Sequence, residues 1–166
     1  MSLIIFSNFR IDSAERLHRM KDSFNSFKDA NIKKWVVNFR GEFKDEAFNF
    51  LYKHLGNSLQ ASFLESKSGW FHDSRKLINN IDSEFVLYWI EDQICMCGVD
   101  KLNKVIEEMQ ISNSEYLSYS WFGLGASIDE FNNIQKDEYE NIFSLDYNKK
   151  SHKIRIKNSK HILGIK

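Results

Sequence analysis

The sequence lacks proline and has no long apolar segment. Proline makes up about 5% of an average protein, and its absence here accompanies a composition shifted toward Asn, Lys, Ile and Phe. We attach no function to that absence. No apolar run approaches the roughly 20 residues that span a bilayer, and the N-terminus lacks a basic segment followed by an apolar one. The sequence therefore predicts a cytoplasmic protein without a membrane-spanning helix.

Cysteine is also scarce. The chain has two cysteines, Cys95 and Cys97, which lie on either side of Met96. Two cysteines do not make the disulfide framework of a small secreted protein, and neighbours this close do not easily form a disulfide with each other. No second pair of Cys or His lies at zinc-finger spacing from them. Idle or buried thiols are therefore favoured over a metal site.

The chain has no net charge, because 23 Lys and Arg residues balance 23 Asp and Glu residues. No global field therefore favours nucleic acid or an anionic membrane as a partner. The basic charge gathers at the C-terminal end, where residues 149–166 carry seven Lys or Arg residues and no Asp or Glu. We expect a β-hairpin there, formed by the alternating residues 153–157 and by 161–165, with its lysines in water.

The basic C-terminus has two alternative roles. A peripheral contact with anionic lipid at the inner face of the membrane is one alternative. Binding of nucleic acid is not expected, because the aromatic side chains of a stacking platform are missing from the segment.

Apolar runs and helical periodicities alternate through the first 110 residues. A capping-box pattern, Asp12 followed by Glu15, precedes the first helix. The order predicts an α/β fold, namely a three-layer sandwich with a mostly parallel, Rossmann-like sheet and a small C-terminal β-hairpin, within a single domain of residues 1–166. The strongest strand, 84–90, is expected to be buried. Strands are predicted at 3–6, 35–39, 59–64, 84–90 and 116–122, and helices at 13–29, about 47–55, 70–81 and about 102–109.

Polar residues follow three of these strands. Asn8 and Arg10 come after the first, Arg40 after the second, and Glu91 and Asp92 after the fourth. Ligands of open parallel sheets bind beyond the carboxyl ends of the strands. Guanidinium groups suit phosphates and carboxylates suit Mg²⁺ or Mn²⁺, so the pattern predicts a nucleotide-diphosphate site. The alternative is that these charges are ordinary solvated strand ends.

No Gly-rich phosphate loop of the Rossmann or P-loop type follows the first strand. This absence argues against a nicotinamide dehydrogenase and against a nucleotide triphosphatase.

The order of segments resembles that of GT-A-type glycosyltransferases, within the large inverting family of nucleotide-diphospho-sugar transferases. The likeness is carried by SLIIFSNFR, by Gly69 followed by Arg75 on a helix, and by SEFVLYWIEDQ, and it covers about residues 3–100. It implies a nucleotide-diphosphate sugar donor, an Mg²⁺ or Mn²⁺ ion held by Asp92, and a glycan or lipid-linked acceptor. The residues that would surround the donor are Asn8, Arg10, Arg40, Arg75 and Glu91.

Three departures from the family pattern keep a second interpretation open. Asn38 to Gly41 replace the acidic pair that the family places after its second strand, and Gln93 replaces the third carboxylate of the metal motif. The chain also ends before an acceptor-binding half, so we expect either a minimal member of the family or the N-terminal part of a longer protein. The alternative function is a non-catalytic binding or scaffolding module with the same fold.

The catalytic base of a transferase stays unassigned. The pairs Asp129-Glu130 and Asp137-Glu138 are candidates, and nothing in their spacing selects one. In the cluster Trp70-Phe71-His72-Asp73, neighbours on a helix do not face one another. We therefore expect a solvated His72, and Trp70 in the core or in a pocket wall.

Overall fold

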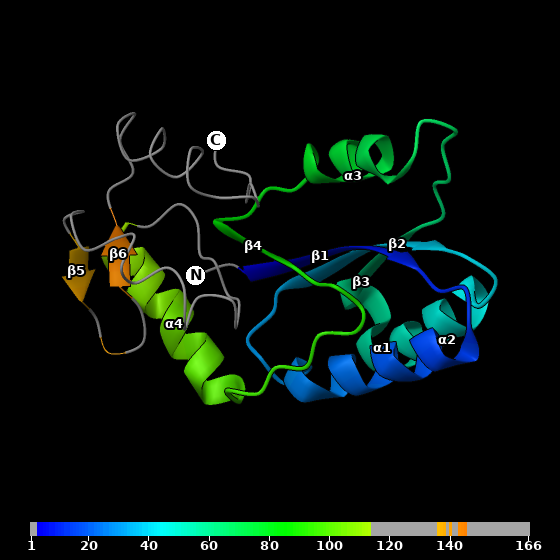
Figure 1. Ribbon diagram of the computed structural model, residues 1–166. Helices are drawn as coiled ribbons and strands as arrows, with labels where there is room; N and C mark the ends of the chain where they lie inside the picture. The colour runs from blue at the N-terminus through cyan, green and yellow to red at the C-terminus, as the bar shows by residue number, and fades with distance from the viewer. Residues whose placement is uncertain (1–2, 114–135, 139, 141–142, 146–166) are drawn as a thin grey trace, which may run out of the picture. The chain divides into compact units, whose positions relative to one another are not determined.

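The computed structural model describes residues 3–113, 136–138, 140 and 143–145 (Figure 1). It divides into two compact units, Met1–Asn103 and Lys104–Lys166. The predicted strand 116–122 and the predicted C-terminal hairpin lie outside the described residues, as do the acidic pair at 129–130 and the whole basic segment 149–166.

Strands and helices alternate through the first unit in the predicted order. Its elements are β1 (Leu3–Arg10), α1 (Ala14–Phe27), β2 (Lys34–Arg40), α2 (Lys44–Leu55), the short 3-10 helix η1 (Gly56–Ser58), β3 (Leu59–Ser62), α3 (Trp70–Ile78) and β4 (Phe85–Tyr88). Helix α4 (Val99–Ile111) begins in this unit and ends in the second. In the second unit β5 (Lys136–Glu138) pairs with β6 (Phe143–Leu145) in an antiparallel sense.

The four strands of the first unit form one sheet in the order β3-β2-β1-β4, and every pair in it is parallel. The chain moves outward from β1 to β2 and β3, then crosses back to place β4 on the other side of β1. The predicted mostly parallel α/β sheet is thereby confirmed. The reversal of strand order places a topological switch point between β1 and β4, which is where open α/β sheets bind ligands.

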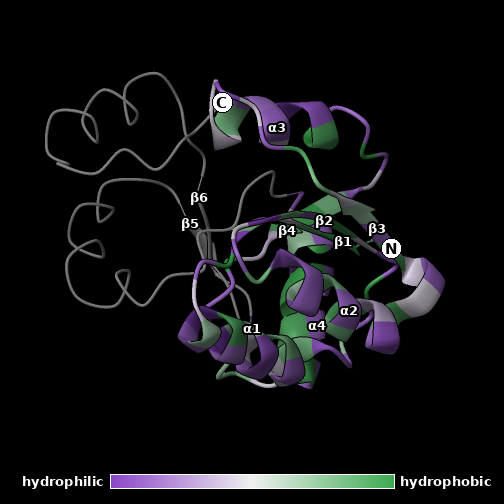
Figure 2. Ribbon diagram, turned by 90° about the vertical axis from the view of Figure 1, so that its right-hand side faces the viewer, coloured by the Kyte–Doolittle hydropathy of each residue, from purple (hydrophilic) through white to green (hydrophobic). Residues whose placement is uncertain are grey.

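The sheet is the middle of three layers. Helices α1 and α2 cover one face, and α3 lies on the opposite face (Figures 1 and 2). On the side of α1, the rings of Trp35 and Trp89 lie 5.4 Å apart, and Phe27 stacks on Trp35. On the side of α3, a smaller buried cluster is formed by Ile4, Phe6, Val36 and Leu77. The predicted three-layer, Rossmann-like sandwich is therefore what the first unit forms.

Helix α1 shows how the sequence specifies an element. Ser13 has an extended backbone, and its hydroxyl accepts a hydrogen bond from the Arg16 amide at 3.2 Å. This N-cap satisfies one of the free amides of the first turn. The predicted capping box from Asp12 is thus wrong by one residue, because the Asp12 carboxylate pairs with Arg10 instead. The residues that bury the helix recur at steps of three and four: Leu17, Met20, Phe24 and Phe27.

Strand β4 differs from its prediction. The run 84–90 was expected to be wholly buried, but the strand covers Phe85–Tyr88 and has a paired neighbour on one side. An edge strand alternates between a covered and an open face. Tyr88 is accordingly 48% exposed, while the adjacent Trp89 is 4% exposed. The run 84–90 therefore forms a strand with one face more covered than the other, followed by Trp89 in the aromatic core.

None of the helices in the part of the chain that the structure describes combines the length and the apolar character needed to cross a membrane.

Candidate functional site

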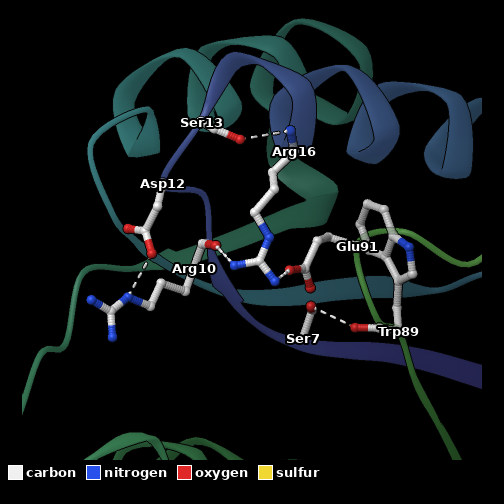
Figure 3. A network of polar contacts seen from close by, with 7 residues as sticks. All are labelled: Ser7, Arg10, Asp12, Ser13, Arg16, Trp89 and Glu91. Carbon is white, nitrogen blue, oxygen red and sulfur yellow. Dashed lines mark hydrogen bonds and ion pairs between the residues drawn. The ribbon is translucent and has the colours of Figure 1, made fainter.

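The carboxyl ends of β1, β2 and β4 bring most of the predicted site residues to one edge of the sheet. In the register of β1 and β2, Asn8 lies opposite Asn38 and Arg10 lies opposite Arg40. The segment after β4 carries Glu91 to the same edge, where it contacts the start of α1 (Figure 3). The predicted convergence of Asn8, Arg10 and Glu91 is thus seen in the backbone arrangement, although their side chains have different partners.

Asn8 and Asn38 form a polar link inside this edge. Asn38 is fully buried, and its amide donates to the Asn8 side-chain oxygen at 2.9 Å and to the Leu64 carbonyl at 2.9 Å. The Asn8 amide in turn donates to the Trp70 carbonyl at 3.0 Å and to the Ser74 hydroxyl at 2.7 Å. Both amides are directed into the protein. The Asn8 amide holds the start of α3 against the sheet, and the Asn38 amide fixes the Asn8 side chain.

Arg10 and Arg40 are neighbours on adjacent strands, and like charges in this arrangement repel. Arg10 is compensated by the Asp12 carboxylate at 2.9 Å, in an exposed ion pair. Arg40 is half-buried, and its Nε atom is buried without a hydrogen-bond partner among the residues that the structure describes. A buried donor without a partner is costly and calls for an explanation. Within the described residues, Arg40 is thus a positive charge without an ion-pair partner at this edge.

Gly41 fixes the backbone that follows Arg40. Its φ is 93°, and a Cβ atom placed there would lie 2.5 Å from the Ile11 carbonyl oxygen. The Ile11 amide donates to the Arg40 carbonyl at 2.8 Å, so the loops after β1 and β2 touch at this point. A residue without a side chain is required for that approach. The position of Arg40 therefore depends on Gly41.

Arg16 joins the ends of β1 and β4, a connection that the sequence did not reveal. One of its guanidinium nitrogens donates to the Arg10 carbonyl at 3.0 Å, and the other lies 3.0 Å from a Glu91 carboxylate oxygen (Figure 3). The Glu91 side chain is 11% exposed and that of Arg16 is 47% exposed. Glu91, predicted to contact the donor, is thus neutralised by the protein itself. Nothing in the sequence indicated that Arg16 belongs to this site.

Buried serines hold the segment after β4 in place. The Ser7 hydroxyl donates to the Trp89 carbonyl at 2.7 Å (Figure 3). The Ser23 hydroxyl accepts from the Trp89 indole nitrogen at 2.9 Å and donates to the Gln93 carbonyl. Both serines are fully buried. The chain from Trp89 to Gln93 is therefore tied to β1 and to α1, with the Gln93 side chain exposed.

Asp92 and Arg75 are both exposed. Neither forms a hydrogen bond or an ion pair with another of the predicted site residues within the described ranges. Arg75 lies on the solvent side of α3, away from the contacts that join Asn8 to that helix.

The carboxylates at this edge bear on the predicted metal ion. No group of three or more His, Cys, Asp or Glu side chains that could hold a metal ion occurs in the described part of the chain. Glu91 is engaged by Arg16, which leaves Asp92 as the free carboxylate of the segment. A single carboxylate suits Mg²⁺ where substrate phosphates and water supply the other ligands. Asp92 is therefore compatible with an ion shared with a bound diphosphate.

The pKa of Tyr88 is shifted by burial and by two charged side chains at this edge. Partial burial raises the pKa of its hydroxyl above the ordinary value, and the negative charge of Glu91 raises it further. The positive charge of Arg40 lowers the pKa of the same hydroxyl. Arg40 and Glu91 are therefore both near enough to act on Tyr88. The site combines a compensated carboxylate with an uncompensated guanidinium.

The start of α3 places aromatic surface beside the site. Trp70 and Phe71 are 55% and 59% exposed. Trp70 is therefore not in the core, and its alternative place in a pocket wall stays a prediction. Asp73 is buried and accepts a hydrogen bond from the Ser66 amide at 3.0 Å, whereas His72 is exposed. His72 is thus solvated, as predicted, and Asp73 stabilises the loop before the helix.

A hollow of about 210 Å³ lies at the amino ends of β1 and β2. Its polar lining includes Lys33, Lys34, Gln60 and Asp82. It is at the end of the strands opposite to the predicted site, so it does not contribute to that site.

Comparison with protein-family models, with characterised proteins and with solved structures gave no match for this chain.

Proposed function

We propose that the protein binds a nucleotide-diphosphate sugar at the carboxyl ends of β1, β2 and β4, and that it transfers the sugar to an acceptor hydroxyl. The observation that carries the proposal is the buried Nε atom of Arg40, which has no hydrogen-bond partner in the described part of the chain. It lies at the edge where open parallel sheets bind their ligands.

The charge balance of this edge supports a phosphate as the ligand. Asp12 compensates Arg10, and Glu91 is paired with Arg16. Arg40 has no ion pair within the described residues, so it adds an unpaired positive charge. A guanidinium group offers donors in a rigid fork that matches phosphate oxygens. A diphosphate bound beside the half-buried Arg40 side chain would compensate its charge and reduce the repulsion between Arg40 and Arg10.

In the proposed reaction, Arg40 binds the diphosphate and stabilises the negative charge that develops on it as the sugar leaves. Asp92 is the residue that would hold Mg²⁺ or Mn²⁺, which supplies further neutralisation of the leaving group. The exposed rings of Trp70 and Phe71 offer a surface for the base or the sugar. Asn8 acts indirectly, because its amide positions the first turn of α3. The acceptor, in this proposal, is a glycan or a lipid-linked glycan presented on the cytoplasmic side of a membrane.

A second candidate function is a non-catalytic module that binds the same ligand class. The ion pair between Arg16 and Glu91 favours it, because this pair removes one carboxylate from metal binding. Gln93, whose side chain is exposed, supplies no third carboxylate. The two functions share the Arg40 site and differ in their need for a metal.

Calorimetry with uridine- and guanosine-diphosphate sugars, with and without Mn²⁺, separates the two. A transferase binds its donor more tightly with Mn²⁺, loses this gain in Asp92→Asn, and hydrolyses or transfers the sugar over time. A binding module binds equally with and without the ion, and Asp92→Asn changes nothing. Absence of binding to either nucleotide sugar, with or without Mn²⁺, would contradict both.

A further inference from the structure

The loop between β4 and α4 brings two thiols together. The Sγ atoms of Cys95 and Cys97 lie 3.6 Å apart, and both cysteines are free and partly exposed. In a strand, side chains two residues apart point to the same face but lie about 7 Å from one another. Here a turn at Met96-Cys97 closes that gap. The sequence alone favoured idle or buried thiols, because no second pair of Cys or His lies at zinc-finger spacing from them.

The backbone around the pair is held from both sides. The Cys95 amide donates to the Ser26 hydroxyl at 2.9 Å, and Ser26 in turn donates to the Ser23 carbonyl at 2.6 Å. After the pair, Gly98 has a φ of 80°, which reverses the chain into α4. The thiols are therefore presented by a loop that is anchored to α1. An anchored pair loses less conformational freedom when it binds a ligand than a free pair does.

The separation of the two sulfurs matches that of two ligands of one tetrahedral ion. Zinc–thiolate bonds are about 2.3 Å long, which places two sulfurs on the same tetrahedral zinc about 3.8 Å apart. The observed 3.6 Å is close to this value. We propose that Cys95 and Cys97 form a two-thiolate site for a thiophilic cation of the Zn²⁺ class, independent of the Arg40 site and of the proposed transferase activity.

Binding at this site is an exchange of protons for metal. Both thiols lose their protons as two metal–sulfur bonds form, so each divalent ion releases two protons, and water completes the coordination. Because both cysteines bind the ion as thiolates, affinity for the ion increases as the pH rises.

Met96 separates the two cysteines and provides the matched control. It is 85% exposed, and its thioether is not required by the proposed site. Substitution Met96→Leu preserves the length of the loop and both thiols. It should bind the cation as the wild type does, which distinguishes a dithiol site from a site that uses all three sulfurs.

The test is titration of the reduced protein with Cd²⁺ under anaerobic conditions, following thiolate-to-metal absorbance and proton release, with Zn²⁺ as competitor. We expect one ion per chain, two protons per ion, and a loss of affinity of about 100-fold in Cys95→Ser and in Cys97→Ser, because each removes the chelate. Circular dichroism confirms that the variants fold. Equal affinity in the wild type and either serine variant, or formation of a disulfide with no metal uptake, would overturn the proposal.

Discussion

Arg16 and Glu91 form an ion pair of 3.0 Å whose carboxylate is almost buried, and this pair joins α1 to the segment after β4. Through its second nitrogen, Arg16 also holds the Arg10 carbonyl. Two strand ends and a helix start are therefore fixed by one side chain. The sequence predicted that Glu91 contacts the sugar donor, whereas in the structure its carboxylate is paired with Arg16.

The first prediction concerns the strength of this pair. A double-mutant cycle with Arg16→Ala and Glu91→Ala should give a coupling energy of about 1–2 kcal/mol, between the values of exposed and fully buried pairs. The exposed pair of Arg19 and Glu15 is shorter, at 2.6 Å, and serves as the control. Its coupling should not exceed about 0.5 kcal/mol. Urea unfolding measures both, and equal coupling in the two cycles would contradict the role given to burial.

The second prediction concerns Ser23. Substitution Ser23→Ala leaves the Trp89 indole nitrogen and the Gln93 carbonyl without their partner, at a fully buried position. We expect a loss of about 1–3 kcal/mol in the free energy of unfolding. The exposed Ser58 is the matched control, and Ser58→Ala should stay within about 0.5 kcal/mol. The account of the anchored segment fails if the two alanine variants are equally stable.

The third prediction concerns Gly41. Substitution Gly41→Ala places a methyl group 2.5 Å from the Ile11 carbonyl oxygen, at a positive φ. The free energy of unfolding should fall by more than about 1 kcal/mol. Gly98 also has a positive φ, but a Cβ there meets nothing within 4 Å. Gly98→Ala should therefore be the less harmful of the two in thermal unfolding, and the reverse order would contradict the close approach of the loops.

The fourth prediction concerns pH. The pKa of Tyr88 is raised in the folded protein, first by burial and then by Glu91. Between the unfolded value of about 10 and the higher folded value, the unfolded chain has lost the proton that the folded chain keeps. The stabilisation is therefore complete below about pH 10 and is lost as the pH rises through the folded pKa.

Tyr88→Phe removes this dependence. The stability of the variant relative to the wild type should increase between pH 9 and pH 11 in urea unfolding. Tyr52→Phe, on the exposed side of α2, is the control for removal of one tyrosine hydroxyl. Identical pH profiles for the two variants would show that Tyr88 has no special environment.

The periodicity of the sequence predicted the sheet and the helices of the first unit well. The apolar run 3–6 predicted a strand, and the three- and four-residue steps of Leu17, Met20 and Phe24 predicted a helix. Both elements are present, as β1 and α1. The order of the strands in the sheet could not be predicted from the sequence. The edge position of β4 depends on the crossover from α3, which no local pattern encodes, and that position explains the exposure of Tyr88.

The candidate site was predicted in part. Polar residues after three strands did gather at one edge, because the strands are parallel. The partner of each side chain could not be read from the sequence, since Arg16 reaches Glu91 over a separation of 75 positions in the chain and Asn8 reaches Ser74 over 66. Side-chain partners of this kind depend on tertiary packing. They decide which residues are free for a ligand.

The most direct test of the central claim is calorimetry of the uridine- and guanosine-diphosphate sugars with Arg40→Gln, beside the matched control Arg19→Gln on α1. The uncompensated guanidinium of Arg40 should pair with the diphosphate, so Arg40→Gln should weaken binding by about 10- to 150-fold. Arg19→Gln should bind as the wild type does. Unchanged affinity in Arg40→Gln, with the fold preserved, would contradict a phosphate site at this edge.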